Sequence, residues 1–254
     1  MKVNAKDYKK RNLILLCIAN FFIAGSLTMI LPFISLYIHT LGTYSNEYVQ
    51  RWAGLIFGVS FLTGFLFSPL WGRVGDKKGR KPLLVLFGSG VSLCILLMGF
   101  AQTVHQLFLI RVLMGLFAGF IPTAQALIAV QTPKHEAGKV MGTLQTGSTS
   151  GTLIGPLLGG ILADTVGFQY TFIITAVFTG LASLGVAIVV KEIHGTKLKQ
   201  RDKSYTGFEV FKYIFTTPLL LTVMISSTII QIANFALQPL LALYVQQLQV
   251  SGHI

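Results

Sequence analysis

Long apolar runs alternate with short polar loops along most of the chain. Seven runs have helical length, at residues 12–38, 52–71, 83–101, 106–130, 140–163, 169–190 and 218–245. About 20 predominantly apolar residues make a helix long enough to cross the hydrocarbon core of a bilayer. The pattern therefore predicts an all-α integral membrane protein with seven spans.

Composition agrees with this interpretation. Hydrophobic residues make up 53% of the 254 residues and charged residues only 11%, against roughly 25% charged residues in soluble domains. The formal net charge of +12 could indicate a nucleic-acid partner, but the basic residues lie in short loops between apolar runs. Such placement is typical of membrane topology, so we expect membrane lipids and no nucleic acid as partners.

The cysteines and the N-terminus narrow the class further. Cys17 and Cys94 both lie inside apolar runs, so we expect no disulfide framework, no metal and no cofactor. The basic start resembles that of a signal peptide, but the apolar run behind it is too long for one. We therefore interpret this run as an uncleaved first span.

The basic loops predict the orientation of the spans. Of the 20 Lys and Arg residues, all but Arg51 and Arg111 lie in the N-terminal tail or in the second, fourth and sixth loops. We expect the protein in the cell (plasma) membrane, and the positive-inside rule places these basic segments, including the N-terminus, on its cytoplasmic side. Seven spans then leave the C-terminus of this chain outside the cell. The polar stretch Lys191–Thr217 contains Phe208, Phe211 and Phe215 at helical spacing, which predicts a short helix at the cytoplasmic interface or one packed on protein.

Two halves of the first 190 residues repeat. Gly72-Asp76-Gly79 and Gly160-Asp164-Gly167 share the spacing G-x-x-x-D-x-x-G at an offset of 88 residues. Because each repeat has three spans, the second copy is inverted, an arrangement typical of secondary transporters. We expect a six-helix bundle over 1–190, a linker over 191–217, and at 218–254 the first span of an incomplete C-terminal half.

The second loop reads GRVGDKKGRKP and is rich in glycine and charge. Its glycines allow sharp turns and close helix approach. Asp76 and Arg80 are four residues apart, so they share a face on a helical turn. A plain cytoplasmic turn with positive-inside lysines is the alternative. The candidate gating loop comprises Gly72, Gly75, Asp76, Gly79, Arg80 and Lys81.

Arg111 is a charge placed within an apolar span. A guanidinium in hydrocarbon is costly, so it should face a wet cavity or a partner. The alternative is that it snorkels to the outer interface. On a continuous helix, Gly115 and Gln125 would lie on the same face as Arg111.

Polar side chains in other spans are candidates for one cavity. The seventh span carries Gln231, Asn234 and Gln238 at i, i+3 and i+7, a polar stripe that can line a cavity or bond another helix. Asn20, Gln125 and Gln145 are further candidates.

The stretch GSTSGTLIGPLLGG contains glycines at every fourth position: Gly147, Gly151, Gly155 and Gly159. Small residues at this spacing form a groove in which two helix backbones can touch. Pro156 removes a backbone hydrogen bond and predicts a bend. This pattern fits simple helix packing and also the hinge of an alternating-access transporter.

Together these stretches resemble the major facilitator superfamily. Gly72–Leu83 is similar to the family's loop motif G-x-L-A-D-R-x-G-R-K-x-L, with Val74 and Lys77 as departures. Arg111–Gly115 resembles its R-x-x-x-G motif, associated with proton transfer. Gly151–Gly160 resembles its antiporter motif g-x-x-x-G-P-x-x-G-G, which includes Gly155, Pro156, Gly159 and Gly160. The resemblance is to Gram-positive multidrug efflux pumps of the twelve-span drug:proton antiporter group.

The resemblance implies proton-coupled export of amphipathic, often cationic drugs by a protein that is monomeric when full length. It implies that Arg111 and Gly115 serve proton coupling. The chain stops after seven spans, so a truncated, non-transporting fragment is one alternative, and an exporter of sugars or other metabolites is another. No nucleophile–base pair is evident, so we expect no enzyme activity.

Overall fold

The computed structural model describes residues 5–30, 33–192, 213 and 215–233. The helices of the first part are α1 (Ala5–Met29), α2 (Ile34–Thr40), α3 (Asn46–Lys78), α4 (Arg80–Met98), α5 (Val104–Leu116), α6 (Phe120–Gln131) and α7 (Ala137–Val189). The chain divides into two compact units, at residues 1–197 and 198–254. In the second unit, a further apolar helix covers Pro218–Ala233. The predicted interfacial helix and the linker fall mostly outside the described residues.

The described helices have the length and the apolar surface of membrane spans. Five segments are long and apolar enough to cross a bilayer: α1, α3, α4, α7, and α5 together with α6. α7, with 53 residues, would be about 80 Å long as one straight helix, against about 30 Å of hydrocarbon. Its backbone is non-helical at Gly167, so it supplies two predicted spans. The all-α prediction is confirmed within the described residues, whose elements are all helices.

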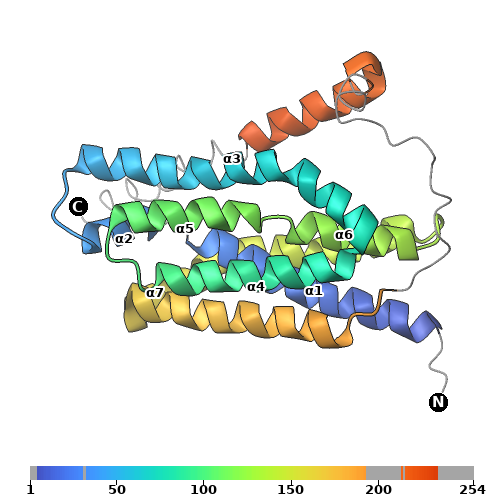
Figure 1. Ribbon diagram of the computed structural model, residues 1–254, viewed down its shortest axis with the longest axis horizontal. Coiled ribbons are helices and arrows are strands. Elements are labelled where there is room, and N and C mark those ends of the chain that lie inside the picture. The colour runs from blue at the N-terminus through green and yellow to red at the C-terminus, as the bar shows by residue number, and fades with distance from the viewer. Residues whose placement is uncertain (1–4, 31–32, 193–212, 214, 234–254) are drawn as a thin grey trace, which may run out of the picture. The chain divides into compact units, whose positions relative to one another are not determined.

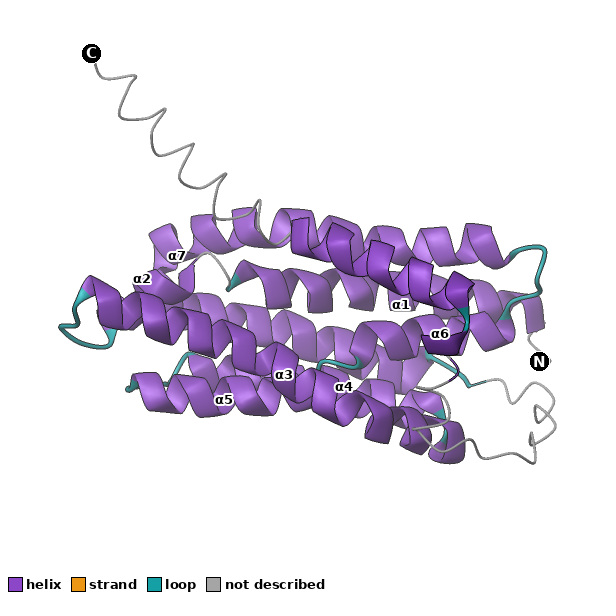
Figure 2. Ribbon diagram, turned by 90° about the horizontal axis from the view of Figure 1, so that it is seen from above, coloured by secondary structure: helices purple, strands orange, loops and turns teal. Residues whose placement is uncertain are grey.

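Successive spans of the first unit lie side by side in Figures 1 and 2, and the colours of Figure 1 show that they alternate in direction along the chain. α1 runs parallel to the first part of α7, because Cys17 faces Gly147 and Met29 faces Gly159. α4 runs antiparallel to the second part of α7, where the Ser92 hydroxyl donates to the Ala176 carbonyl at 2.7 Å and the Ser183 hydroxyl donates to the Val85 carbonyl at 3.3 Å.

α3 lies parallel to α5, since Ser60 contacts Arg111 and Thr63 contacts Gly115. Together with the other two pairings, this direction is the one that six successive membrane crossings require. The helices therefore pack as spans that cross alternately up and down.

Two apolar clusters hold the bundle together, one toward each end. The first joins Ile38, Ile56, Ile95 and Leu107. The second joins Leu16, Leu84, Phe120 and Leu144. Large apolar side chains also cover the outside, with Phe65 76% and Leu153 73% exposed. A surface of this kind suits a lipid environment, in which the backbone polar groups are already paired within helices.

Two glycines at equivalent repeat positions share a backbone conformation. Gly79 has φ 93° and ψ 161°, and Gly167 has φ 82° and ψ 166°. They are the positive-φ glycines among the described residues, and they are 88 residues apart. The parallel contact of α1 with the first part of α7 has a counterpart in the parallel contact of α3 with α5. The inverted repeat stays a prediction, and this equivalence supports it.

Gly167→Ala should destabilise the bundle through its backbone alone. An added Cβ meets nothing within 4 Å, but an L-residue with positive φ costs about 1–3 kcal/mol. We expect a thermal midpoint several degrees lower, measured by size-exclusion chromatography of heated, detergent-solubilised protein. Gly142→Ala is the matched control, because Gly142 is helical and equally open; an equal loss in both variants would contradict the strain argument.

Candidate transport site

The glycine groove is the contact between α1 and the first part of α7. Gly147, Gly151, Gly155 and Gly159 are all buried. They face α1 residues that are also spaced by four: Cys17, Phe21, Gly25 and Met29. A Cβ on Gly155 would lie 2.5 Å from the Gly25 carbonyl oxygen and 2.8 Å from Thr28 Oγ1. A side chain at these positions would therefore push the two helix backbones apart.

The helix continues through the proline of this motif. Pro156 lies inside α7, whose backbone φ and ψ are non-helical at Gly167, and the bend predicted at Pro156 stays a prediction. Thr28 Oγ1 lies 3.5 Å from the Thr152 carbonyl oxygen, which Pro156 leaves without its helical donor. Gly160 is half-buried, and a Cβ there would lie 3.3 Å from the Phe33 ring.

The candidate gating loop forms a sharp junction between α3 and α4. Gly79 ends α3 with positive φ, and α4 begins at the next residue. Gly75 is buried, and a Cβ there would lie 3.1 Å from Leu83 Cδ1. Gly72 has open space around it, so nothing in the described bundle requires glycine at that position.

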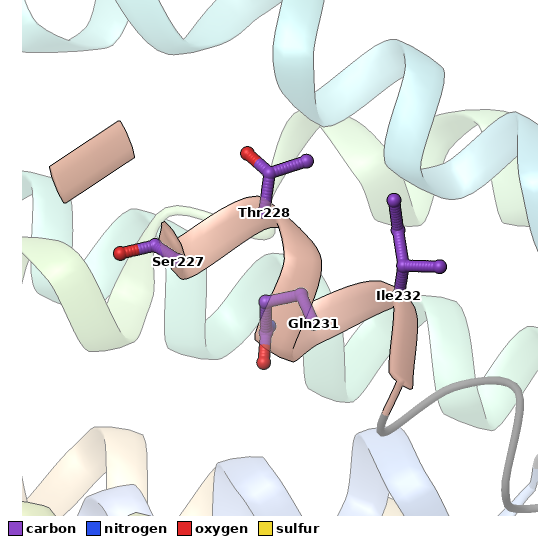
Figure 3. Close-up of a pocket in the computed structure, with 4 residues that line it drawn as sticks. All are labelled: Ser227, Thr228, Gln231 and Ile232. Atoms are coloured by element: carbon purple, nitrogen blue, oxygen red, sulfur yellow. The ribbon is translucent and has the colours of Figure 1, made fainter. Parts of the chain in front are cut away.

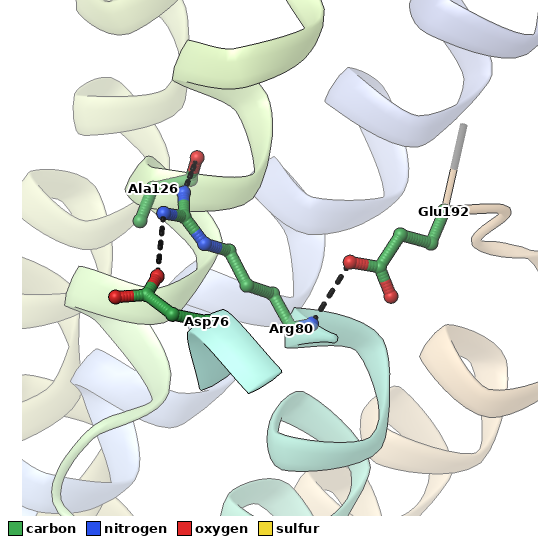
Figure 4. Close-up of polar contacts among 4 residues, drawn as sticks. All are labelled: Asp76, Arg80, Ala126 and Glu192. Carbon is green, nitrogen blue, oxygen red and sulfur yellow. Dashed lines mark hydrogen bonds and ion pairs between the residues drawn. The ribbon is translucent and has the colours of Figure 1, made fainter. Parts of the chain in front are cut away.

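Arg80 ties this junction to α6 (Figure 4). Its Nη2 lies 3.5 Å from Asp76 Oδ1, and its Nη1 donates to the Ala126 carbonyl. The Asp76 side chain is 75% exposed and that of Arg80 is 24% exposed. An ion pair this exposed contributes little stability, so the Ala126 bond gives Arg80 its fixed position.

Glu192 completes the junction, and sequence reasoning missed it. Its carboxylate accepts hydrogen bonds from the backbone N–H of Arg80 at 2.9 Å and of Lys81 at 3.2 Å. A Cβ on Gly79 would lie 2.7 Å from Glu192 Oε2. Helix N-termini need such an acceptor, and Gly79 cannot supply a side chain. That missing cap was the available signal in the sequence.

Arg111 lies inside the bundle rather than at its surface. It is 3% exposed, and its Nε and Nη2 have no hydrogen-bond partner among the described residues. The Ser60 hydroxyl donates to its backbone carbonyl at 3.1 Å. A Cβ on Gly115 would lie 2.5 Å from the Ser60 carbonyl oxygen, so glycine there lets α5 touch α3.

Arg111 and Gln125 do not lie on one continuous helix. α5 ends at Leu116 and α6 begins at Phe120, so a turn interrupts the span between them. The prediction that Arg111 and Gln125 share one helix face assumed an unbroken helix, and it is wrong because the helix is interrupted. Gln125 instead meets another predicted cavity residue, donating from Nε2 to Gln145 Oε1 at 2.9 Å.

The remaining cavity candidates are dispersed. Asn20 is fully buried, and neither its Nδ2 nor its Oδ1 has a partner in the described bundle. Gln231, in the second unit, is exposed and lines a surface groove of about 460 Å³ with Ser227, Thr228 and Ile232 (Figure 3). Asn234 and Gln238 lie outside the described residues.

Comparison with known proteins decides the family. The model of the Major Facilitator Superfamily matches residues 16–254, nearly the whole chain. The chain belongs to the major facilitator superfamily. It is therefore a multi-pass membrane protein of a transporter family.

Named relatives of this superfamily member are longer than the chain. An uncharacterized MFS-type transporter, YuxJ of Bacillus subtilis (strain 168), is 53% identical over 231 residues, which are 91% of this chain and 59% of that protein. A multidrug resistance protein, MdtG of Rahnella sp. (strain Y9602), is 39% identical over 239 residues, which are 94% of this chain and 58% of that protein. The chain thus spans less than two thirds of these relatives.

A solved structure has the same fold. The human organic anion transporter MFSD10 (TETRAN) superimposes with a TM-score of 0.63 at 17% identity, over 72% of this chain and 48% of that one. At this level of identity, the similarity concerns the fold alone.

Gly155→Ala should weaken the α1–α7 contact, because its Cβ would overlap the Gly25 carbonyl. We expect a clear loss of monodisperse protein after detergent extraction, measured by fluorescence-detected size exclusion. Gly58→Ala is the control, since a Cβ there meets nothing within 4 Å. Unchanged yield and melting for Gly155→Ala would show that the two helices are not in contact.

Glu192→Ala should loosen the start of α4. Losing a helix cap costs roughly 1 kcal/mol, so the Arg80 and Lys81 amides should exchange hydrogen about fivefold faster. Hydrogen-exchange mass spectrometry of peptides covering Gly79–Leu84 measures this. Glu136→Ala, which removes an exposed acid elsewhere, should leave those peptides unchanged; equal protection in both variants would rule out the cap.

Proposed function

We propose that this chain belongs to a proton-coupled exporter of amphipathic drugs that works by alternating access. The observation that carries the proposal is Arg111, a buried guanidinium with two unpartnered nitrogens inside a transporter bundle. A buried charge without a partner is strongly unfavourable. Such a site fits a cation whose partner changes during a cycle.

Arg111 makes no ion pair among the described residues. In our proposal its partner is transient: water, substrate, or a carboxylate that its charge keeps deprotonated. Proton binding and drug binding then favour opposite-facing states of the cavity, which is the coupling that exchange requires. Gly115 holds Arg111 against α3, and Asn20, Gln125 and Gln145 supply polar groups for the cavity.

The loop and the groove have mechanical roles in this proposal. The Asp76–Arg80–Ala126 contacts form a latch whose exposed ion pair is weak enough to open. The α1–α7 groove allows the two helices to slide without interlocking side chains, as the antiporter motif would require. The fully assembled protein is monomeric, with the N-terminus cytoplasmic and the C-terminus of this chain extracellular.

The names of relatives support the direction and the cargo. MdtG proteins at 37–39% identity carry the name multidrug resistance protein, which favours drug export over export of sugars or other metabolites. Antibiotic resistance would be a consequence of this activity.

Arg111→Gln should strongly slow proton-driven efflux while leaving the fold intact. We expect at least a tenfold slower efflux of a fluorescent cationic dye from cells expressing the gene together with the DNA that follows the codon for Ile254. Arg51→Gln is the matched control, because Arg51 makes an exposed ion pair with Glu47 at 2.6 Å.

Proton-dependent efflux that survives Arg111→Gln would refute the coupling role. The 254-residue chain expressed alone addresses the fragment alternative: dye efflux from that form would reject it. Efflux of a sugar but not of the dye would favour the metabolite alternative.

A further inference from the structure

A second site lies at the end of the bundle where α1 and α7 begin and α6 ends. A cavity of about 480 Å³ opens there, away from Arg111. Its polar lining includes Lys9 and Lys10 of α1, Gln131 at the end of α6, and Lys139 of α7. Because the parallel α1 and α7 both start at this end, the cavity sits beside the first contact of the glycine groove.

The charge of the lining is positive. The lining holds three lysines and one carboxylate, that of Glu136, whose Oε1 lies 3.8 Å from His135 Nε2. Glu136 is the N-cap residue of α7 but makes no side-chain cap bond. The partial positive charge of that helix N-terminus therefore adds to the charge of the lysines. The cavity favours an anion with several acceptor oxygens.

Gln131 is an independent sign of a ligand. Its side chain is 9% exposed and lines the cavity. Its Oε1 accepts a hydrogen bond from Asn12 Nδ2 at 3.3 Å, but its Nε2 donor has no partner among the described residues. A buried donor left unsatisfied is unfavourable. An acceptor oxygen bound in the cavity would relieve it.

The hydroxyl groups of the lining are already used. Thr132 donates to the Ile128 carbonyl at 2.7 Å and Thr143 donates to the Lys139 carbonyl at 3.0 Å. Among the described residues that line the cavity, the side-chain donors left for a ligand are thus the lysine ammonium groups and Gln131 Nε2. Leu13 and Val140 add apolar wall to the same cavity. Lysines next to an apolar wall suit a phospholipid, whose phosphate group lies beside its acyl chains.

We propose that this cavity binds a phosphate group, carried either by an anionic phospholipid or by free phosphate. The bound anion would join the start of α1 to the start of α7. It would therefore stabilise the groove contact by mass action without taking part in the proposed transport chemistry.

Native mass spectrometry of the purified chain, after exchange into equimolar phosphatidylglycerol and phosphatidylcholine, tests the proposal. The unmodified chain should retain phosphatidylglycerol preferentially. Lys9→Gln/Lys139→Gln should lower that retention at least fivefold. Lys78→Gln/Lys134→Gln removes the same charge from basic loops outside the cavity and should stay within twofold.

The variant Gln131→Glu tests the site with little risk of misfolding. It keeps an acceptor for Asn12 but replaces the unpartnered donor with an anionic oxygen, so it should also lower phosphatidylglycerol retention. Thermal unfolding in neutral detergent, with and without inorganic phosphate, separates the two sources. Stabilisation by phosphate that is lost in the lysine pair, with no lipid preference, would identify free phosphate as the ligand.

Two results would overturn the proposal. One is equal loss of lipid in the Lys9/Lys139 and Lys78/Lys134 pairs, which would mean that general charge, not the cavity, attracts the anion. The other is a Gln131→Glu variant that binds phosphatidylglycerol and phosphate as the unmodified chain does.

Discussion

The contact between the backbones of α1 and α7 is the constraint on which the rest of the bundle depends. Small residues at every fourth position of α7 meet positions at the same spacing on α1, so the two helices approach closely over the span from Gly147 to Gly159. In a bilayer there is no hydrophobic driving force between helices, because the lipid tails are as apolar as the side chains. Close van der Waals packing is therefore a main source of helix association. It fixes the parallel direction of the two spans and how closely they approach.

The other features follow from this pairing. Once α1 and the first part of α7 are parallel, the second part of α7 must return beside α4, and the break at Gly167 makes that return possible. Gly79, which the predicted repeat makes equivalent to Gly167, lies at the break between α3 and α4. The charged cluster of Asp76, Arg80 and Glu192 then forms where helix ends meet, because water and free backbone groups are both available there.

Periodicity and loop charge predicted much of this fold, since both are local properties of the sequence. Apolar run length located the first six spans, and the spacing of the glycines located their contact face. What local patterns could not supply was the turn between α5 and α6, because a one-dimensional helix projection cannot detect a break within an apolar run. Glu192 was missed for a different reason: it caps a helix that begins 112 residues earlier in the chain, and no local motif links the two.

The buried polar candidate residues are of two kinds, those whose polar atoms have hydrogen-bond partners and those with unpartnered atoms. Arg80 has partners and holds a junction together. Arg111, Asn20 and Gln131 have unpartnered atoms within the described bundle, and such groups in a membrane protein mark places where something else binds. Buried polar atoms without partners therefore support both the proposed transport site and the proposed phosphate site.

Cross-linking between α1 and α7 in native membranes tests the central contact most directly. Cys17 Sγ lies 3.3 Å from the Thr143 carbonyl oxygen, so Thr143→Cys in a Cys94→Ser background should react with Cys17 through a short bifunctional thiol reagent. A protease site in the loop between α4 and α5 makes the result visible, because cross-linked halves stay together on a denaturing gel. The account predicts efficient joining that disappears with Cys17→Ser; separate halves at every reagent length would contradict it.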